Sequence, residues 1–395
     1  MNILFVHEIN WLTKVVFEPH IYSELLSKKG HKVFAIDFES DWKNLGIDLK
    51  TKHFKKVNRS VKSGSIELIR PGSIKFPGLD RMSYWFTSMV EIDKIIKQKE
   101  IDVVILYSSP TNGIQTLRAA KKYDIPVFFR SLDILHMLVP KKYLRPVVYQ
   151  TEKYVYKKSD RLLALTPKLV KYLEKMGAEK EKIDILLPAV NIKLFKKSKK
   201  DKRLMKLYKI KKDDKVILFI GTLFKFSGMD TFIKKFKKVL KEVPEAKLLV
   251  VGGGGIFEKI KDLTNKNNLQ NKIIFTGFKP FELMPKFISI ADVCINPFEL
   301  CKETKDIIPT KLFQYLACGK PTVAIETPGT KSVLMGKGQG IVFAKNSDDF
   351  VRKVIMLLKN RKMKKSIGNN GYNYVRKNHS YENATKRLEN IISNF

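Results

Sequence analysis

The stretch from Ile307 to Ala324 reads IIPTKLFQYLACGKPTVA, and it decides how the rest of the chain is interpreted. Pro309 fits the first turn of a helix, because the N–H that proline lacks would have no intrahelical partner there. Apolar residues then recur at helical spacing and give the helix one buried face: Leu312, Phe313, Leu316 and Ala317. Gly319 suits the left-handed residue that ends a helix, and Pro321 prevents its continuation. The pattern predicts a helix ending at Gly319 and a buried strand over 322–325.

The start of this helix predicts an anion-binding site, because a helix N-terminus presents unpaired backbone amides and a partial positive charge. Thr310 or the residue before Pro309 would be the N-cap. Lys311 lies one residue inside the helix, and Gln314 shares its face three residues further on. We therefore expect Thr310, Lys311 and Gln314 to bind the diphosphate and the ribose of a nucleotide.

The form P-x-K-L-F-x-Y with its G-K-P ending resembles the signature of retaining glycosyltransferases of family 4, which have the GT-B fold. The family's pattern is a glutamate, seven residues, and a second glutamate. Here Asp306 stands in the first glutamate position and Gln314 in the second. The resemblance covers nearly the whole chain and is most specific over residues 216–324.

This resemblance implies two Rossmann-like α/β domains that face a cleft. An N-terminal acceptor-binding domain would span residues 1–195, and a nucleotide-sugar-binding domain would span 210–378. The last helix, 379–395, would pack back on the first domain. The lysine-rich stretch 196–215 is the expected boundary between them. The alternation of apolar strands with helical segments independently predicts parallel, doubly wound sheets.

Stabilisation of the leaving diphosphate is the main electrostatic task in transfer from a nucleotide sugar. Family members typically place an arginine and a lysine in the loop after the first strand of the second domain. In this chain that loop spans 221–228, and Thr222 and Ser227 occupy the two basic positions. Lys225 is the one cation left in the loop, so we expect Thr222 and Lys225 to contact the donor.

The catalytic candidates are Asp133, His136 and Asp306. Many family members have a histidine after the strand that corresponds to 125–129, but Leu132 stands in its place, and Asp133 and His136 are the nearby replacements. Asp306 would reach the hydroxyls of the donor sugar. The alternatives remain open. Asp306 could be a plain loop residue with Glu299 or Glu303 in its role, and Arg130 could form a structural ion pair with Asp133.

The resemblance implies a retaining hexosyltransferase that moves a sugar from a UDP- or GDP-sugar to a lipid-linked or polysaccharide acceptor. No metal or other cofactor is expected, because basic groups and helix dipoles would take the place of a metal. Two alternatives remain. A catalytically silent GT-B scaffold in a membrane glycan-assembly complex is favoured by the departures at Thr222, Ser227 and Gln314. A GT-B sugar-nucleotide epimerase is the other.

The composition bears on location and partners. The three cysteines show no paired metal spacing and fit a reduced cytoplasm, and no apolar run reaches the ~18 residues of a membrane span. The net charge of +37 fits either a lysine-rich proteome or an anionic surface partner, whereas nucleic acid is not expected. Basic residues are dense over Lys50–Lys75, and over Lys141–Lys158 they alternate with tyrosines. We expect a cytoplasmic protein bound peripherally to the inner face of the cell membrane.

Overall fold

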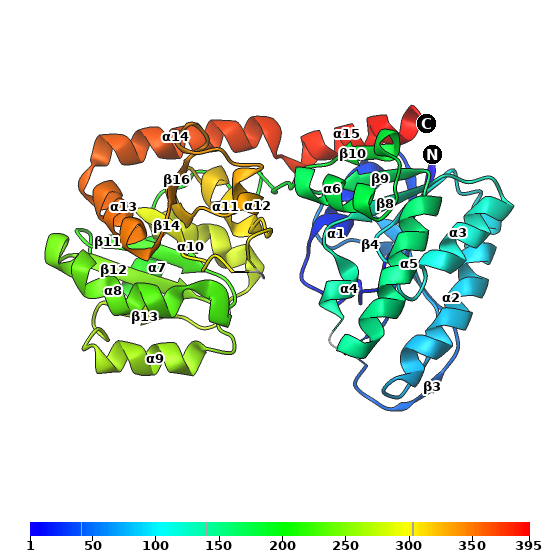
Figure 1. Cartoon of the computed structure of the whole chain (residues 1–395), viewed down its shortest axis with the longest axis horizontal. Coiled ribbons are helices and arrows are strands. Elements are labelled where there is room, and N and C mark those ends of the chain that lie inside the picture. Colours follow the sequence, from blue (N-terminus) through cyan, green and yellow to red (C-terminus); the bar gives the residue numbers. More distant parts are fainter. Residues whose placement is uncertain (41, 140, 302–303) are drawn as a thin grey trace. The chain divides into compact units, whose positions relative to one another are not determined.

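The computed structural model describes residues 1–40, 42–139, 141–301 and 304–395. The chain forms two compact units (Figure 1). Unit 1 comprises Met1–Leu187 and Ala384–Phe395, and unit 2 comprises Pro188–Asn383.

The segment just after the first unit belongs to unit 2 because its contacts lie there. Val190 forms a parallel β-bridge with Ser380, and the Phe195 ring packs 5.5 Å from that of Phe281. The chain thus enters unit 2 at Pro188, ahead of the lysine-rich stretch 196–215.

Unit 1 is built on an eight-stranded sheet in the order β10-β9-β8-β7-β1-β2-β5-β4. All neighbours are parallel except β4, which runs antiparallel to β5 at the edge. The strands are β1 (Asn2–Val6), β2 (Lys32–Ile36), β4 (Lys52–Val57), β5 (Ile66–Arg70), β7 (Val103–Leu106), β8 (Val127–Ser131), β9 (Arg161–Ala164) and β10 (Ile183–Ile185). A small antiparallel pair, β3 (Gly46–Asp48) with β6 (Ser73–Lys75), lies outside this sheet.

The α-helices of unit 1 follow the strands as crossovers, which is why the sheet is parallel. They are α1 (Glu18–Lys28), α2 (Leu79–Gln98), α3 (Gly113–Lys122), α4 (Leu135–Leu138), α5 (Arg145–Lys158) and α6 (Pro167–Lys175). The core joins strand residues such as Leu4, Val104 and Phe129 to helix residues such as Ile92 and Val155. The greater part of α15 (Tyr381–Ser393) also belongs to this unit.

Unit 2 is built on a six-stranded parallel sheet in the order β13-β12-β11-β14-β15-β16. Its strands are β11 (Lys215–Ile220), β12 (Ala246–Val251), β13 (Ile273–Phe275), β14 (Val293–Asn296), β15 (Thr322–Ile325) and β16 (Ile341–Ala344). The strand order reverses between β11 and β14, and ligands of open α/β sheets bind beyond the carboxyl ends of the strands at such a point. The loops that follow these two strands therefore position the site.

The helices of unit 2 are α7 (Lys202–Leu207), α8 (Met229–Glu242), α9 (Phe257–Lys266), α10 (Met284–Ile290), α11 (Thr310–Ala317), α12 (Pro328–Lys331), α13 (Ser347–Lys359) and α14 (Arg361–Asn378). Helices α8, α9 and α13 contribute apolar side chains to one core with the strands, for example Phe232, Ile260 and Val354. Both units are doubly wound, as the strand–helix alternation predicted. Within the described residues, no helix is both long and apolar enough to cross a membrane.

The helix predicted from the opening stretch is α11, and its end follows the prediction. Gly319 has φ +70°, its N–H bonds to the Leu316 carbonyl, and the Lys320 N–H bonds to the Tyr315 carbonyl. This is a Schellman motif. The start differs, because Pro309 is itself the N-cap, with an extended ψ of 118°. Thr310 is therefore the first helical residue and not the cap.

Candidate functional site

The site in unit 2 is built where β11 ends. Tyr315 of α11 accepts a hydrogen bond from the Ile220 N–H at 2.8 Å, which fixes the helix against the end of this strand. The chain then turns at Gly221, whose φ is +141°. A Cβ atom at Gly221 would lie 2.7 Å from Nζ of Lys311, so the lysine reaches directly over the turn. The absence of a side chain at Gly221 makes this approach possible.

Lys311 lies among aromatic rings. Its Nζ is 4.2 Å from the Phe219 ring centre and 5.0 Å from that of Phe298. The ammonium makes no ion pair with any carboxylate of the described residues. Burial lowers the pKa of Lys311 to about 7. A half-buried cation that is held by ring faces alone favours an anionic ligand.

The amino end of α11 adds hydrogen-bond donors beside this cation. The side chain of the N-cap residue, Pro309, cannot accept a hydrogen bond from the helix. The first backbone N–H of α11 that has a partner in the described part of the chain is that of Leu312, which donates to the Pro309 carbonyl at 3.1 Å. The amides of Thr310 and Lys311 have no acceptor among the described residues. Free amides, a positive dipole end and an unpaired lysine together form an anion site.

The tetraglycine after β12 shapes the same turn. A Cβ atom at Gly252 would lie 2.1 Å from the Gly221 carbonyl oxygen, and Gly253 accepts a hydrogen bond from the Leu223 N–H at 2.9 Å. The four glycines thus form a strand-to-helix turn whose backbone packs against the backbone of the Gly221 loop. Only residues without a side chain allow the two backbones to come this close.

The other donor-side candidates are more loosely placed. Thr222 is half-buried beside Gly221, and Lys225 lies exposed in a short 3₁₀ helix, where it makes no ion pair with a described residue. Gln314 is half-buried, and its amide has no side-chain partner in the described part of the chain. Ser227, which stands in a position that is basic in the family, is fully buried.

The loop between β14 and α11 carries Asp306. Its backbone packs so closely on Gly329 that a Cβ atom there would lie 2.5 Å from the Asp306 carbonyl. Glu299 accepts a hydrogen bond from Thr231 at 3.1 Å, while Glu303 lies outside the described residues. The donor-sugar role of Asp306 stays a prediction.

In unit 1 the candidate His136 is oriented by a residue that the sequence did not single out. Nδ1 of His136 lies 2.5 Å from a carboxylate oxygen of the fully buried Glu152. The same carboxylate accepts the backbone N–H groups of Leu135 and His136, at 2.9 and 3.1 Å, and the Tyr156 hydroxyl at 2.7 Å. Because Nδ1 is occupied, Nε2 of His136 is the nitrogen left for a ligand.

The two other residues considered in this loop, Asp133 and Arg130, do not pair with each other. Asp133 is exposed and makes no hydrogen bond with His136. Arg130 does not pair with Asp133, which corrects that alternative. Its guanidinium is buried against Glu18, with N···O distances of 2.6 and 2.9 Å. A buried arginine needs a buried carboxylate nearby, and Glu18 supplies it.

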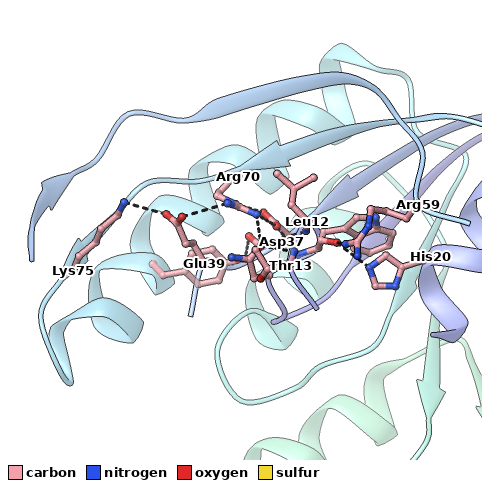
Figure 2. A network of polar contacts seen from close by, with 11 residues as sticks. Leu12, Thr13, His20, Asp37, Glu39, Arg59, Arg70 and Lys75 are labelled. Atoms are coloured by element: carbon pink, nitrogen blue, oxygen red, sulfur yellow. Dashed lines mark hydrogen bonds and ion pairs between the residues drawn. The ribbon is translucent and has the colours of Figure 1, made fainter. Parts of the chain in front are cut away.

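Charged groups fix the loop after β1, which lacks the glycines that the family usually has there (Figure 2). Arg70 donates through Nε to Asp37 at 2.9 Å and lies 3.5 Å from Glu39. The other oxygen of Asp37 accepts the Trp11 N–H at 2.9 Å. The ion pair thus holds the backbone of the loop at the carboxyl end of the first strand.

The comparisons with known proteins agree with this architecture. The model of "Glycosyltransferase Family 4" matches residues 22–194, and that of "Glycosyl transferases group 1" matches residues 200–374. The chain belongs to this family of glycosyltransferases. Among solved structures, this family member resembles Anabaena HepE in complex with UDP, with a TM-score of 0.74, 13% identity and full coverage of both chains. Sucrose-phosphate synthase from Thermosynechococcus elongatus gives a TM-score of 0.73 at 15% identity, covering 100% of this chain and 98% of that one. The fold is therefore GT-B.

The curated relatives are glycosyltransferases that match only part of this chain. An uncharacterized glycosyltransferase of Methanocaldococcus jannaschii is 26% identical over 242 residues, which is 61% of this chain and 60% of the relative. A GDP-mannose-dependent phosphatidylinositol monomannoside mannosyltransferase of Mycolicibacterium smegmatis is 25% identical over 46% of this chain and 48% of its own length. The chain thus spans about half to three fifths of the length of the two relatives named here.

Proposed function

We propose that this protein is a glycosyltransferase that moves a hexosyl group from a UDP- or GDP-sugar to a lipid-linked or growing glycan acceptor, with retention of the anomeric configuration. The observation that supports it best is the unneutralised Lys311 beside Gly221 and the free amides of α11. That arrangement suits a nucleotide diphosphate, which is the part common to all such donors.

The roles follow from charge. As the bond between the sugar and the diphosphate breaks, negative charge grows on the leaving phosphate oxygens. Lys311 and the first amides of α11 would stabilise that charge, which is usually the largest catalytic term. Gln314 would hold the ribose, and Thr222 and Lys225 would contact the donor from the neighbouring loop. These groups would supply the positive charge without a metal ion or other cofactor.

Unit 1 would bind the acceptor. His136, with Nδ1 fixed by Glu152, would present Nε2 to a hydroxyl group, and Asp133 is the carboxylate proposed to act beside it. In unit 2, Asp306 is proposed to act on the donor sugar. Glu152 is a positioning residue in this scheme because it acts only through His136.

A second candidate function is a GT-B scaffold that binds a donor but does not transfer it. The burial of Ser227 favours this reading, because a fully buried residue in a usual basic position leaves the loop with Lys225 alone. Donor binding without turnover, in the presence of a broad acceptor panel, would identify such a scaffold. A new epimer formed from the donor without acceptor would instead identify an epimerase.

The test of the proposal is a panel of UDP- and GDP-sugars measured by thermal unfolding. A ligand at 100 times its dissociation constant raises the free energy of unfolding by about 2.7 kcal/mol. We expect stabilisation by one nucleotide class, lost in Lys311→Ala, and sugar transfer to a glycan or glycolipid acceptor with that donor. If no nucleotide sugar stabilises the protein, the proposed function is wrong.

A further inference from the structure

The outer side of α4 and α5 exposes several large apolar side chains. Five of the described residues between 137 and 147 are large, apolar and exposed: Met137, Leu138, Tyr143, Leu144 and Val147. Tyr143 is 71% exposed, Val147 64% and Leu138 62%. We call residues 137–139 and 141–147 the α5 tip. Unit 1 exposes a second group of large apolar residues over 76–90, but the cation within that segment, Arg81, pairs with Glu8.

The α5 tip is also surrounded by cations and contains no exposed acid. Lys141, Lys142 and Arg145 lie within it, and Lys157 and Lys158 lie at the far end of α5. None of these five forms an ion pair with a described residue. The one acidic residue of the segment 135–158 is Glu152, and it is buried against His136.

The inner side of α5 explains why these side chains point outward. Val155 and Tyr156 belong to the core of unit 1, and the Tyr156 ring packs 5.0 Å from that of Phe129. Val147 and Tyr154, seven residues apart, share the opposite side of α5, and the exposed Tyr143 lies in the 3₁₀ turn just before the helix. Figure 1 shows α4 beside α5, with the first turn of α5 toward the lower edge of unit 1 in that view.

The other basic stretch of the sequence, Lys50–Lys75, uses part of its charge within the fold, while Lys50, Lys55, Lys56 and Lys62 are exposed and form no ion pair with a described residue. Lys52 pairs with Asp48 at 2.6 Å, and Lys75 pairs with Glu39 at 3.0 Å. Arg70 is buried against Asp37 in the network of Figure 2. The α5 tip differs from this stretch because it contains no acidic residue, whereas Asp48 lies among the exposed apolar residues Leu45, Ile47 and Leu49 next to the other stretch.

We propose that the α5 tip docks on an anionic lipid bilayer, with Tyr143, Leu144 and Val147 in the interfacial region and the flanking lysines on lipid phosphates. Tyrosine suits this boundary because its ring is apolar and its hydroxyl is polar. Lysines near an anionic surface are attracted over about a Debye length. The charge argues against a second copy of this chain, since a twofold contact would place Lys141 and Lys142 against like charges.

This inference rests on the proposed function and sharpens it. Met137 and Leu138 directly follow His136, the candidate acceptor-site residue, so a docked tip would hold that histidine at the membrane surface. The acceptor class that fits is a sugar carried by a membrane lipid, and the surface that fits is the anionic cytoplasmic leaflet. A soluble acceptor would gain nothing from this placement.

The experiment is cosedimentation of the full chain with vesicles of phosphatidylglycerol and phosphatidylcholine, or of phosphatidylcholine alone. One variant replaces Tyr143, Leu144 and Val147 with serine, and a second replaces Lys141, Lys142, Lys157 and Lys158 with glutamine. The matched charge control changes Lys202, Lys206, Lys362 and Lys365, which are exposed on unit 2, to glutamine. The matched apolar control changes Leu207 and Met335 to serine.

We expect binding to the anionic vesicles only, weakened at least tenfold in both tip variants and unchanged in both controls. In a Tyr143→Trp variant, brominated lipids should quench the new tryptophan more than in a Leu207→Trp variant. Equal loss in the charge control, or binding that salt does not weaken, would overturn the proposal. So would a concentration-dependent dimer that the serine variant abolishes, because a second copy would then cover the tip.

Donor binding is measured on the same variants by thermal unfolding without vesicles. We expect the tip variants to bind nucleotide sugar like the parent protein. If vesicle binding fails while a nucleotide sugar still stabilises the protein, the docking is wrong and the proposed function stands. If vesicle binding holds while no nucleotide sugar binds, the proposed function falls and the lipid surface remains.

Discussion

The ammonium group of Lys311 lies 4.2 Å from the centre of the Phe219 ring, although the two residues belong to different elements of unit 2. The contact places a cation with no carboxylate partner among the described residues at the carboxyl end of β11. An anion bound there would have its charge neutralised by the protein alone.

Replacing this cation should weaken diphosphate binding selectively. Lys311→Met keeps the apolar stem and removes the charge, and a charge-assisted hydrogen bond is worth about 1.5–3 kcal/mol. We expect the affinity for a nucleotide sugar to fall roughly 10- to 150-fold and the affinity for the nucleoside to stay the same, measured by calorimetry. Lys225→Met should have a smaller effect, because Lys225 is exposed. Equal losses for nucleoside and nucleotide sugar would remove Lys311 from the site.

Donor affinity should depend on pH through the same residue. Because burial lowers the pKa of Lys311 to about 7, raising the pH through neutrality removes the charge in the free protein. Affinity for a nucleotide sugar should therefore decrease between about pH 6 and about pH 9. In this range part of the protein has a neutral Lys311, which should take up a proton when the nucleotide sugar binds. Calorimetry in two buffers of different ionisation enthalpy measures this uptake, and Lys311→Met should abolish it. A flat pH profile in the parent protein would contradict the assignment.

The stability of the folded chain should show the opposite trend. The pKa of Lys311 is lower in the folded than in the unfolded chain, so between about pH 7 and about 10.5 the unfolded chain binds more protons. The free energy of unfolding should therefore rise with pH in this window, relative to that of Lys311→Met. Urea denaturation of both proteins at several pH values measures the difference.

The tetraglycine offers a test within four consecutive residues. A Cβ atom at Gly252 would lie 2.1 Å from the Gly221 carbonyl oxygen, and its φ is +138°, whereas nothing lies within 4 Å of a Cβ atom at Gly255. Gly252→Ala should lower the free energy of unfolding by about 1–3 kcal/mol or more and weaken nucleotide binding. Gly255→Ala should change it by less than about 0.5 kcal/mol. Similar effects in urea unfolding would mean that the turn is not built on this contact.

Glu152 should matter for stability and for His136 together. Glu152→Gln keeps the shape but removes a carboxylate that accepts two backbone N–H groups, the His136 ring and the Tyr156 hydroxyl. We expect a loss of about 1–3 kcal/mol in the free energy of unfolding. The effects of Glu152→Gln and His136→Gln on transfer rate should not add, because one residue acts through the other. Fully additive effects would make Glu152 a structural residue only.

Gln314 can be changed to the glutamate that the family has. Its amide has no side-chain partner among the described residues, so Gln314→Glu should leave the fold intact and offer a stronger acceptor to ribose hydroxyls. We expect unchanged or tighter binding of the nucleotide sugar in calorimetry. A loss of more than tenfold would place Gln314 against another acceptor or a negative group and end its ribose role.

The sequence alone determined the alternation of strands and helices and the end of α11. The apolar spacing of Leu312 and Leu316 and the glycine at 319 predicted α11 and its Schellman end, because both signals act within a few residues of backbone. The strand–helix alternation predicted doubly wound sheets for the same reason. The start of α11 was predicted one position off. The φ angle of proline suits both the N-cap and the first turn of a helix, and only ψ, which proline does not fix, distinguishes the two positions.

Only the tertiary structure decided which side chains meet. Nothing in the local pattern pairs Lys311 with Phe219 and Phe298, His136 with Glu152, or Arg130 with Glu18, since these contacts join segments far apart in the chain. The same holds for charge. Two basic stretches look alike as sequence, but in one Lys52, Arg70 and Lys75 pair with carboxylates, and in the other the cations form no ion pair with a described residue and lie beside exposed apolar side chains. Burial and pairing depend on long-range packing, which local periodicity does not encode.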